Sequence, residues 1–138
     1  MNKSQQTNFL NIKSKILLVD DNPVMRELGK ECLLLNDYMV ALASNGKEAL
    51  EKISKNKYDL ILLDIQMPIL DGFETIKQLN QWKERPPVIA LTAKSSRTDI
   101  SECFHAGFDD VLTKPYNFTE YSEIIKKHLN EIQFKNNI

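Results

Sequence analysis

The sequence has few of the residues on which several large classes of protein depend. Its two cysteines are too few for a disulfide framework, and both Cys32 and Cys103 fall in helical patterns, where we expect small core residues. No apolar run approaches the roughly 18 residues that a membrane span needs. With four glycines, the chain has no Gly-rich phosphate loop after its first apolar run. A formal net charge of −1 indicates no direct nucleic-acid binding. We therefore expect a cytoplasmic protein without membrane insertion.

The length of 138 residues suits one domain. The first residues, MNKSQQTNFLNIKSK, lack the apolar region and cleavage site of a signal peptide. We expect residues 1–13 to form a flexible polar tail, residues 14–134 to form the domain and residues 135–138 to be frayed.

Apolar runs alternate with helical patterns along the chain. Strands are predicted at residues 15–19, 38–43, 58–63, 87–92 and 110–113. The first, third and fourth are almost continuously apolar, which is typical of parallel strands buried on both faces. This β-α alternation predicts an α/β fold, in which helices cover both faces of a five-stranded parallel sheet.

The segments between these strands carry helix signals. Helices are predicted from Pro23, from Asn45 and from Asp71, and over residues 96–106 and 117–134. A glutamate follows both Asn45 and Asp71 at the spacing of a capping box, and Gly107 is a residue type that ends helices. The apolar stripe of the first helix consists, at helical spacing, of Met25, Leu28, Cys32 and Leu35.

Polar residues follow the strands at their carboxyl ends, where open parallel α/β sheets bind ligands. They are Asp20, Asp21, Asp64, Thr92 and Lys114. Three crowded carboxylates need a cation, and hard oxygen ligands suit Mg²⁺. Asp20 and Asp21 alone could instead cap the first helix, but the polar residues at the other strand ends favour a metal site.

A carboxylate beside Mg²⁺ can act as a nucleophile toward a phosphoryl group. Asp64 follows the middle strand and is the candidate nucleophile. Mg²⁺, the Lys114 ammonium and the Thr92 hydroxyl would each take one phosphoryl oxygen.

Other polar residues are expected to serve the structure. Asp71 is interpreted as a helix cap, and Asp109 and Asp110 lie at the start of a strand, which is the wrong edge for the site. His105 and His128 are placed near helix ends, where a cation is favourable.

Four segments together resemble a known family. ILLVDDNPVMRE, YDLILLDIQMPILDGFE, PVIALTA and AGFDDVLTKPY closely resemble the receiver domain of two-component response regulators, over about residues 14–130. The resemblance implies a flavodoxin-like (βα)5 three-layer sandwich with strand order 2-1-3-4-5.

The resemblance also implies roles for individual residues. Asp64 would accept a phosphoryl group from a partner's phosphohistidine, with Thr92 and Lys114 as switch hydroxyl and phosphate-binding lysine. The metal ligands would be Asp20, Asp21, Asp64 and the backbone carbonyl of Gln66. The Lys114–Pro115 bond is expected to be cis.

The implied function is a phosphorylation-switched module that signals through altered protein–protein interaction. DIQMPILDG and CFHAGFDDVLTKP are similar to receivers of hybrid sensor kinases and phosphorelays. The expected partners are a sensor histidine kinase, a histidine phosphotransfer domain, and a fused or separate output protein. A stand-alone receiver and a piece of a longer chain both fit, with Met1 favouring a natural start, and a weak dimer stays open.

The alternative is an enzyme, a Mg²⁺-dependent aspartyl-phosphate phosphatase on a similar sheet. Such enzymes carry a second acid two residues after the nucleophile, to protonate the leaving group. Gln66 occupies that position and cannot do so, so we expect catalysis only of the protein's own phosphorylation and dephosphorylation. Val111 stands where the family often has an aromatic switch residue, which puts the usual coupling of Thr92 to an aromatic ring in doubt.

Overall fold

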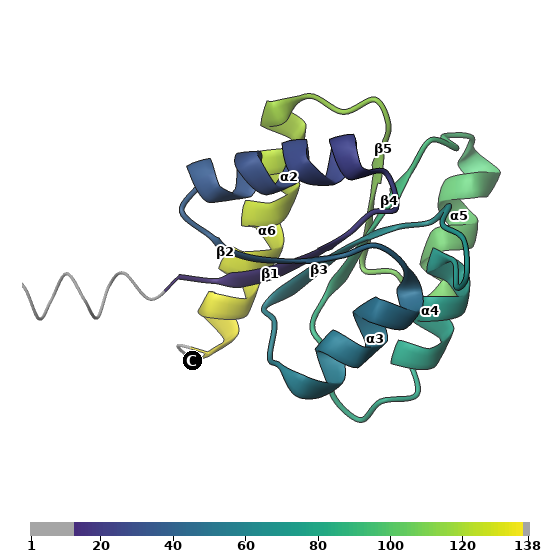
Figure 1. The fold of residues 1–138 in the computed structure, drawn as a ribbon, viewed down its shortest axis with the longest axis horizontal. Coiled ribbons are helices and arrows are strands. Elements are labelled where there is room, and N and C mark those ends of the chain that lie inside the picture. The colour runs from purple at the N-terminus through teal and green to yellow at the C-terminus, as the bar shows by residue number, and fades with distance from the viewer. Residues whose placement is uncertain (1–12, 137–138) are drawn as a thin grey trace, which may run out of the picture.

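A computed structural model describes residues 13–136, with side chains placed up to residue 129. The expected tail and frayed end fall mostly outside these residues. The strands are β1 (Lys15–Val19), β2 (Met39–Ala43), β3 (Leu60–Asp64), β4 (Val88–Thr92) and β5 (Asp110–Thr113). All neighbouring strands are parallel and follow the order β2-β1-β3-β4-β5. The predicted strand order is therefore confirmed (Figure 1).

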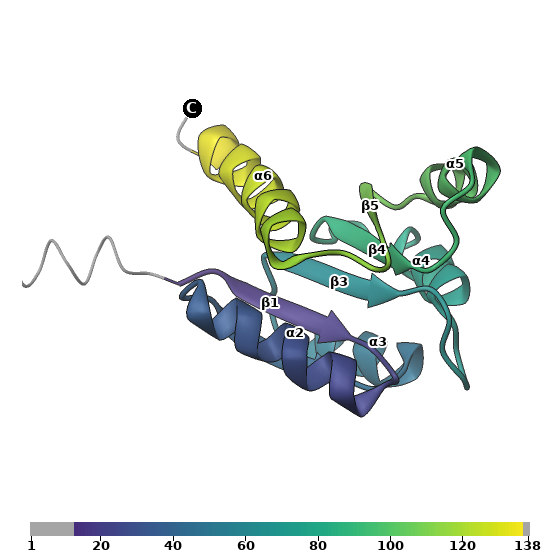
Figure 2. The same cartoon turned by 90° about the horizontal axis from the view of Figure 1, so that it is seen from above.

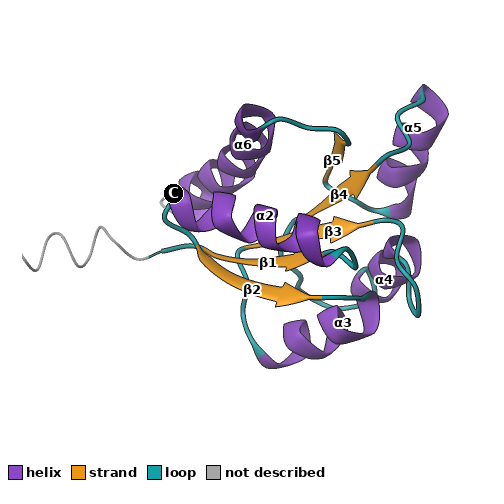
Figure 3. Cartoon of the chain, turned by 45° about the horizontal axis from the view of Figure 1, so that its top comes forward, coloured by secondary structure: helices purple, strands orange, loops and turns teal. Residues whose placement is uncertain are grey.

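Helices cover both faces of this sheet. They are α2 (Pro23–Leu35), α3 (Gly46–Lys55), α4 (Gly72–Leu79), α5 (Arg97–Ala106) and α6 (Phe118–Asn136). α2 and α6 lie on one face, and α3, α4 and α5 lie on the other (Figures 1 and 3). The fold is the expected flavodoxin-like three-layer sandwich. Among the described residues, none of the helices has the length and apolar character needed to cross a membrane.

Each face of the sheet has its own hydrophobic core. Alternate residues of one strand point to opposite faces, so Leu17 packs on the α3, α4 and α5 side while Ile16 and Leu18 pack on the α2 and α6 side. Every residue of β3 and β4 is buried. Burial on both faces explains why these strands read as continuous apolar runs.

The helix ends follow the signals in the sequence. Asp71 and Ser96 form reciprocal capping boxes at the starts of α4 and α5, and Gly107 ends α5 with a left-handed φ of 109°. Asp71 is thus a helix cap, as predicted. At α3, Asn45 accepts from the backbone N–H of Glu48, but the Glu48 carboxylate turns to the backbone and hydroxyl of Ser44.

The apolar stripe predicted for the first helix is wrong at Leu28 and Leu35, whereas Cys32 packs against the core on the α2 and α6 side. Leu28 is 56% exposed and Leu35 is 78% exposed, whereas Leu33 is 1% exposed. The last turn of α2 carries three consecutive leucines, so helical spacing alone could not decide which of them meets the sheet. The cysteines are free, with Cys103 buried and Cys32 half-buried.

The loop between β3 and α4 is closed at its base and tied to α3. The Gly72 N–H donates to the carbonyl of Ile65 at 2.8 Å, and a Cβ at Gly72 would lie 2.7 Å from the carbonyl oxygen of Asp64. The Gly46 N–H donates to the carbonyl of Leu70 at 3.1 Å. Because only glycine permits the approach at residue 72, the start of α4 fixes the backbone directly after Asp64.

Candidate metal centre

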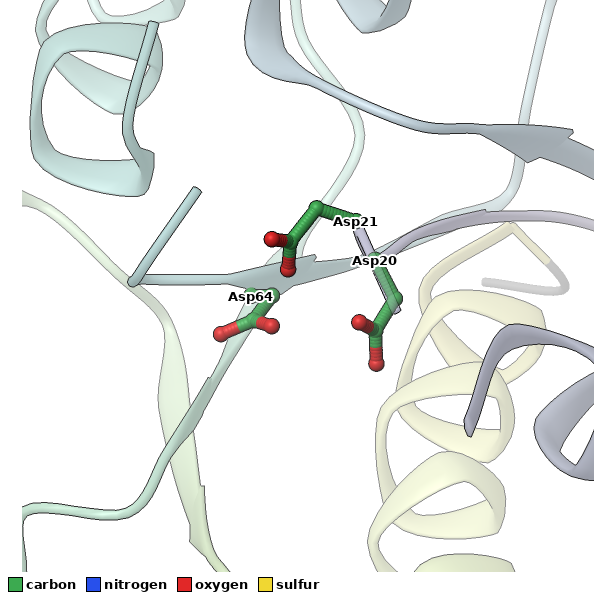
Figure 4. A group of neighbouring side chains, drawn as sticks. All are labelled: Asp20, Asp21 and Asp64. Atoms are coloured by element: carbon green, nitrogen blue, oxygen red, sulfur yellow. The ribbon is translucent and has the colours of Figure 1, made fainter. Parts of the chain in front are cut away.

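Three carboxylates meet at the carboxyl edge of the sheet. β1 and β3 are adjacent parallel strands (Figure 2), and Asp20, Asp21 and Asp64 lie at their carboxyl ends. One carboxylate oxygen of each lies within 4.8 Å of the other two. Asp20 is 1% exposed and Asp64 is 5% exposed, whereas Asp21 is exposed. Figure 4 shows the three carboxyl groups gathered around one space.

Asp20 is held by the end of β2, by the turn that leads into α2 and by α2 itself. Its N–H donates to the carbonyl of Ala43 at 3.1 Å. Its Oδ1 accepts from the N–H of Asn22 at 2.9 Å, and its backbone carbonyl accepts from Arg26 Nη1 at 2.8 Å. Asn22 in turn caps α2 by accepting from the N–H groups of Val24 and Met25.

Asp64 lies between a cation and the other acids. Its Oδ2 accepts from Lys114 Nζ at 3.2 Å, and its Oδ1 accepts from the N–H of Gln66 at 3.1 Å. Burial raises the pKa of Asp64; Lys114 lowers it and Asp20 raises it again, with the net direction upward. The Gln66 side chain is exposed.

Thr92 and Lys114 reach the same edge from β4 and from the residue after β5. The N–H of Lys114 donates to the carbonyl of Thr92 at 2.7 Å, which aligns the two strand ends. Thr92 is buried, and its Oγ1 accepts from the N–H of Lys94 at 3.1 Å. The Lys114–Pro115 bond is cis, as expected.

The donor set at this edge fits a hard divalent cation. Three carboxylates stand close together, and among the described residues Lys114 alone forms ion pairs with them, at 3.2 Å to Asp64 and 3.9 Å to Asp20. Carboxylate oxygens with room for water are the ligands that Mg²⁺ prefers. The sequence-derived site residues are therefore brought together as a group.

Two residues of this edge were not foreseen from the sequence. Asn22 carries a local signal, because Asn before Pro at a helix start is a typical N-cap. Arg26 carries none, since its bond to the Asp20 carbonyl depends on the shape of the turn. Val111 is half-buried and packs against the core on the α3, α4 and α5 side.

The fold and this edge define a class of protein: α/β domains with an acidic group and a lysine at the carboxyl ends of a 2-1-3-4-5 sheet. The family model described as the response regulator receiver domain matches residues 16–126. The chain belongs to this family. It is a receiver domain of the two-component type, and such domains are signalling modules.

Relatives that match this chain include a hybrid histidine kinase and a response regulator. Hybrid signal transduction histidine kinase B of Dictyostelium discoideum is 39% identical, over 84% of this chain and 7% of that protein. Response regulator MprA of Mycobacterium sp. (strain KMS) is 41% identical, over 77% of this chain and 46% of that protein. The chain therefore spans less than half the length of either relative.

A solved structure has the same fold together with a metal. The receiver domain of sensor histidine kinase PA1611 from Pseudomonas aeruginosa PAO1 is 33% identical, with a TM-score of 0.79 over 86% of this chain and 98% of that chain. That structure has a magnesium ion coordinated in its active site cleft.

Proposed function

We propose that Asp64 accepts a phosphoryl group from a phosphohistidine on a partner protein. The observation that carries this proposal is the meeting of three carboxylates with Lys114 at one sheet edge. A carboxylate oxygen of Asp64 attacks phosphorus, the P–N bond to the histidine breaks as the P–O bond forms, and the freed imidazole takes a proton from solvent.

The residues around Asp64 are suited to hold the transferred charge. Lys114 is already 3.2 Å from Asp64 Oδ2 and would pair with one phosphoryl oxygen, while the Thr92 hydroxyl would donate to another. Asp20, Asp21, Asp64 and the backbone carbonyl of Gln66 would hold Mg²⁺. When bound, this cation neutralises charge that develops on the phosphoryl oxygens. The magnesium in the related PA1611 receiver supports this assignment.

Phosphorylation would then change what the domain binds. An added phosphate brings about −1.5 to −2 charges to a buried position, and it would draw Thr92 and Lys114 toward it. Thr92 Oγ1 now accepts from the N–H of Lys94, so its movement would release the start of the β4–α5 loop. Val111 on the adjacent strand has no aromatic ring that could rotate with Thr92. In this proposal the signal is therefore passed on by movement of the β4–α5 loop backbone.

The partner in this proposal is a sensor histidine kinase or a histidine phosphotransfer domain, and the output protein is fused or separate. The hybrid kinase among the relatives supports such a donor. Two free cysteines fit the reducing cytoplasm in which donor and receiver would meet. Turnover of an outside substrate is disfavoured, because Gln66 stands where a phosphatase of this type would need its second acid.

Intact mass after incubation with acetyl phosphate tests the proposal. We expect a single Mg²⁺-dependent phosphoryl adduct on the native protein and none on Asp64→Asn. Asp71→Asn is the matched control, because this carboxylate caps α4 outside the site and should leave the adduct unchanged. An adduct that survives Asp64→Asn would overturn the assignment of the acceptor.

A further inference from the structure

We propose that Arg26 is a positioning residue for the metal site, acting on Asp21 without touching its carboxylate. This inference rests on the proposed function, because it concerns how the acidic pair is presented to Mg²⁺. Its basis is the hydrogen bond of 2.8 Å from Arg26 Nη1 to the backbone carbonyl of Asp20.

The carbonyl of Asp20 belongs to the peptide group that joins Asp20 to Asp21. A peptide group is planar, so fixing the direction of its oxygen also fixes the direction of its N–H and the start of the next residue. Asp21 is exposed, and within the described part of the chain its carboxylate has no hydrogen bond or salt bridge of its own. The orientation of Asp21 therefore depends on the backbone that Arg26 holds.

The hydrogen bond from Arg26 is the last of the bonds that hold Asp20. Asp20 is fixed by the N–H of Asn22 on its side chain and by the carbonyl of Ala43 on its N–H. Its carbonyl is the remaining backbone group, and α2 returns Arg26 to it one turn after the helix start. A charged donor on a carbonyl forms a stronger bond than a neutral one.

Arg26 bonds to this carbonyl although carboxylates lie close by. Across the residues that the structure describes, its guanidinium takes part in no salt bridge, whereas Lys114 pairs with both Asp20 and Asp64. A positive charge beside the site would, by itself, repel a metal ion and weaken its binding. If Arg26 positions Asp21, removing the guanidinium should weaken Mg²⁺ binding. If Arg26 acts only as a repelling charge, its removal should strengthen Mg²⁺ binding.

The experiment compares Mg²⁺ binding by calorimetry, at constant ionic strength, among the native protein, Arg26→Met and Lys30→Met. Lys30 lies on the same helix, where it pairs with Glu27 at 3.6 Å, so its variant loses the same charge without loosening the turn. We expect Mg²⁺ to bind about tenfold more weakly to Arg26→Met, as is typical when a residue that orients metal ligands is lost. Lys30→Met should bind like the native protein or slightly more tightly.

A second readout needs no metal. In the metal-free protein, the amide hydrogen of Asn22 should exchange faster in Arg26→Met than in Lys30→Met, because the bond that holds the turn is gone. Urea unfolding of each variant shows whether the domain still folds cooperatively, and Arg26→Lys serves in place of Arg26→Met if it does not. That variant keeps the charge and loses the planar fork, so it should also bind Mg²⁺ more weakly.

Mg²⁺ binding to Arg26→Met that equals or exceeds native binding would overturn the inference, as would an equal loss in Lys30→Met. Either result, with a Mg²⁺-dependent adduct on native Asp64, leaves the proposed function standing. A native protein that binds no Mg²⁺ overturns both.

Discussion

Two pairs of adjacent aspartates lie at opposite edges of the sheet and have opposite surroundings. Asp109 and Asp110, at the start of β5, each have a cation from the protein. Asp109 Oδ2 accepts from Arg85 Nη1 at 2.8 Å and from the N–H of Val88 at 2.8 Å. Asp110 Oδ2 lies 2.9 Å from His128 Nε2 and 3.4 Å from Lys127 Nζ.

Asp20 and Asp21, after β1, have less positive charge beside them, because Asp21 takes part in no ion pair among the described residues and Asp20 has only Lys114. Lys114 Nζ is 3.9 Å from Asp20 Oδ2 and is shared with Asp64. The same dipeptide is thus neutralised by the chain at one edge and left short of positive charge at the other. The pair that is short of positive charge, with the carboxylate of Asp64 beside it, is therefore the one available to a metal ion.

The largest effect on stability should come from breaking the neutralised pair. We predict that Asp109→Ala lowers the free energy of unfolding by about 2 kcal/mol, because it removes the charged acceptor of the largely buried Arg85 guanidinium and the side-chain acceptor of the Val88 N–H. Urea unfolding of the native protein and the variant measures this difference. A change below about 0.5 kcal/mol, the range of ordinary surface substitutions, would show that the contacts of Asp109 contribute little to stability.

At the other edge, removing a charge should stabilise the metal-free protein. Asp64 is buried beside Asp20, and its raised pKa means that ionisation of this carboxyl costs folding free energy as the pH rises above the pKa of the unfolded chain. Asp64→Asn removes that cost, so we predict that the variant is more stable than the native protein at neutral pH without Mg²⁺. Urea unfolding in EDTA measures the difference, and a less stable variant would contradict the idea of a charge-strained edge.

The two groups of aspartates differ in how much of their surroundings the sequence predicts. The strands and the carboxyl-edge residues could be predicted, because β3 and β4 are continuous apolar runs that place Asp64 and Thr92 at their ends. The partners of Asp109 and Asp110 could not be predicted. Arg85 lies 24 residues from Asp109, and local periodicity carries no information about such contacts.

His128 shows the same limit. Its predicted place near a helix end, where a cation is favourable, does not match its position well inside α6, where it is buried and bonded to Asp110. The contact joins residues 18 apart and arises from the packing of α6 against β5. The prediction for Leu28 and Leu35 of α2 is wrong for a related reason. Apolar residues lie on several sides of this helix, so the sequence does not decide which side packs against the sheet.

The pH dependence of stability should report on the surroundings of Asp110. Burial acts to raise the pKa of Asp110, but hydrogen bonds from His128 and from the N–H of Val111, together with the charge of Lys127, outweigh it and hold that pKa below its usual range. The stabilisation is then fully present above the unfolded pKa of about 3.9 and is lost as the pH falls through the folded pKa.

Asp110→Asn should remove this contribution. The difference in unfolding free energy between native protein and variant should shrink as the pH falls from about 5 to about 3. Urea unfolding across this pH range measures that difference. A difference that grows toward low pH would contradict a lowered pKa at Asp110.

The smallest effect on stability is expected for Asp21→Asn. Its side chain is exposed, so the free energy of unfolding without Mg²⁺ should change by less than about 0.5 kcal/mol. Its affinity for Mg²⁺ should nevertheless fall, because a charged ligand is lost. Unfolding in EDTA and a Mg²⁺ titration of the same sample would separate the two roles, and a large loss of stability would mean that Asp21 supports the fold.

The most direct test of the unneutralised edge is the free energy of unfolding of the native protein with and without Mg²⁺, beside Asp21→Asn and Asp110→Asn. We predict that Mg²⁺ at a hundred times its dissociation constant stabilises the native protein and Asp110→Asn by about 2.7 kcal/mol. Asp21→Asn should gain much less at the same concentration. A native protein whose stability does not respond to Mg²⁺, or a response that follows Asp110 rather than Asp21, would contradict the metal site.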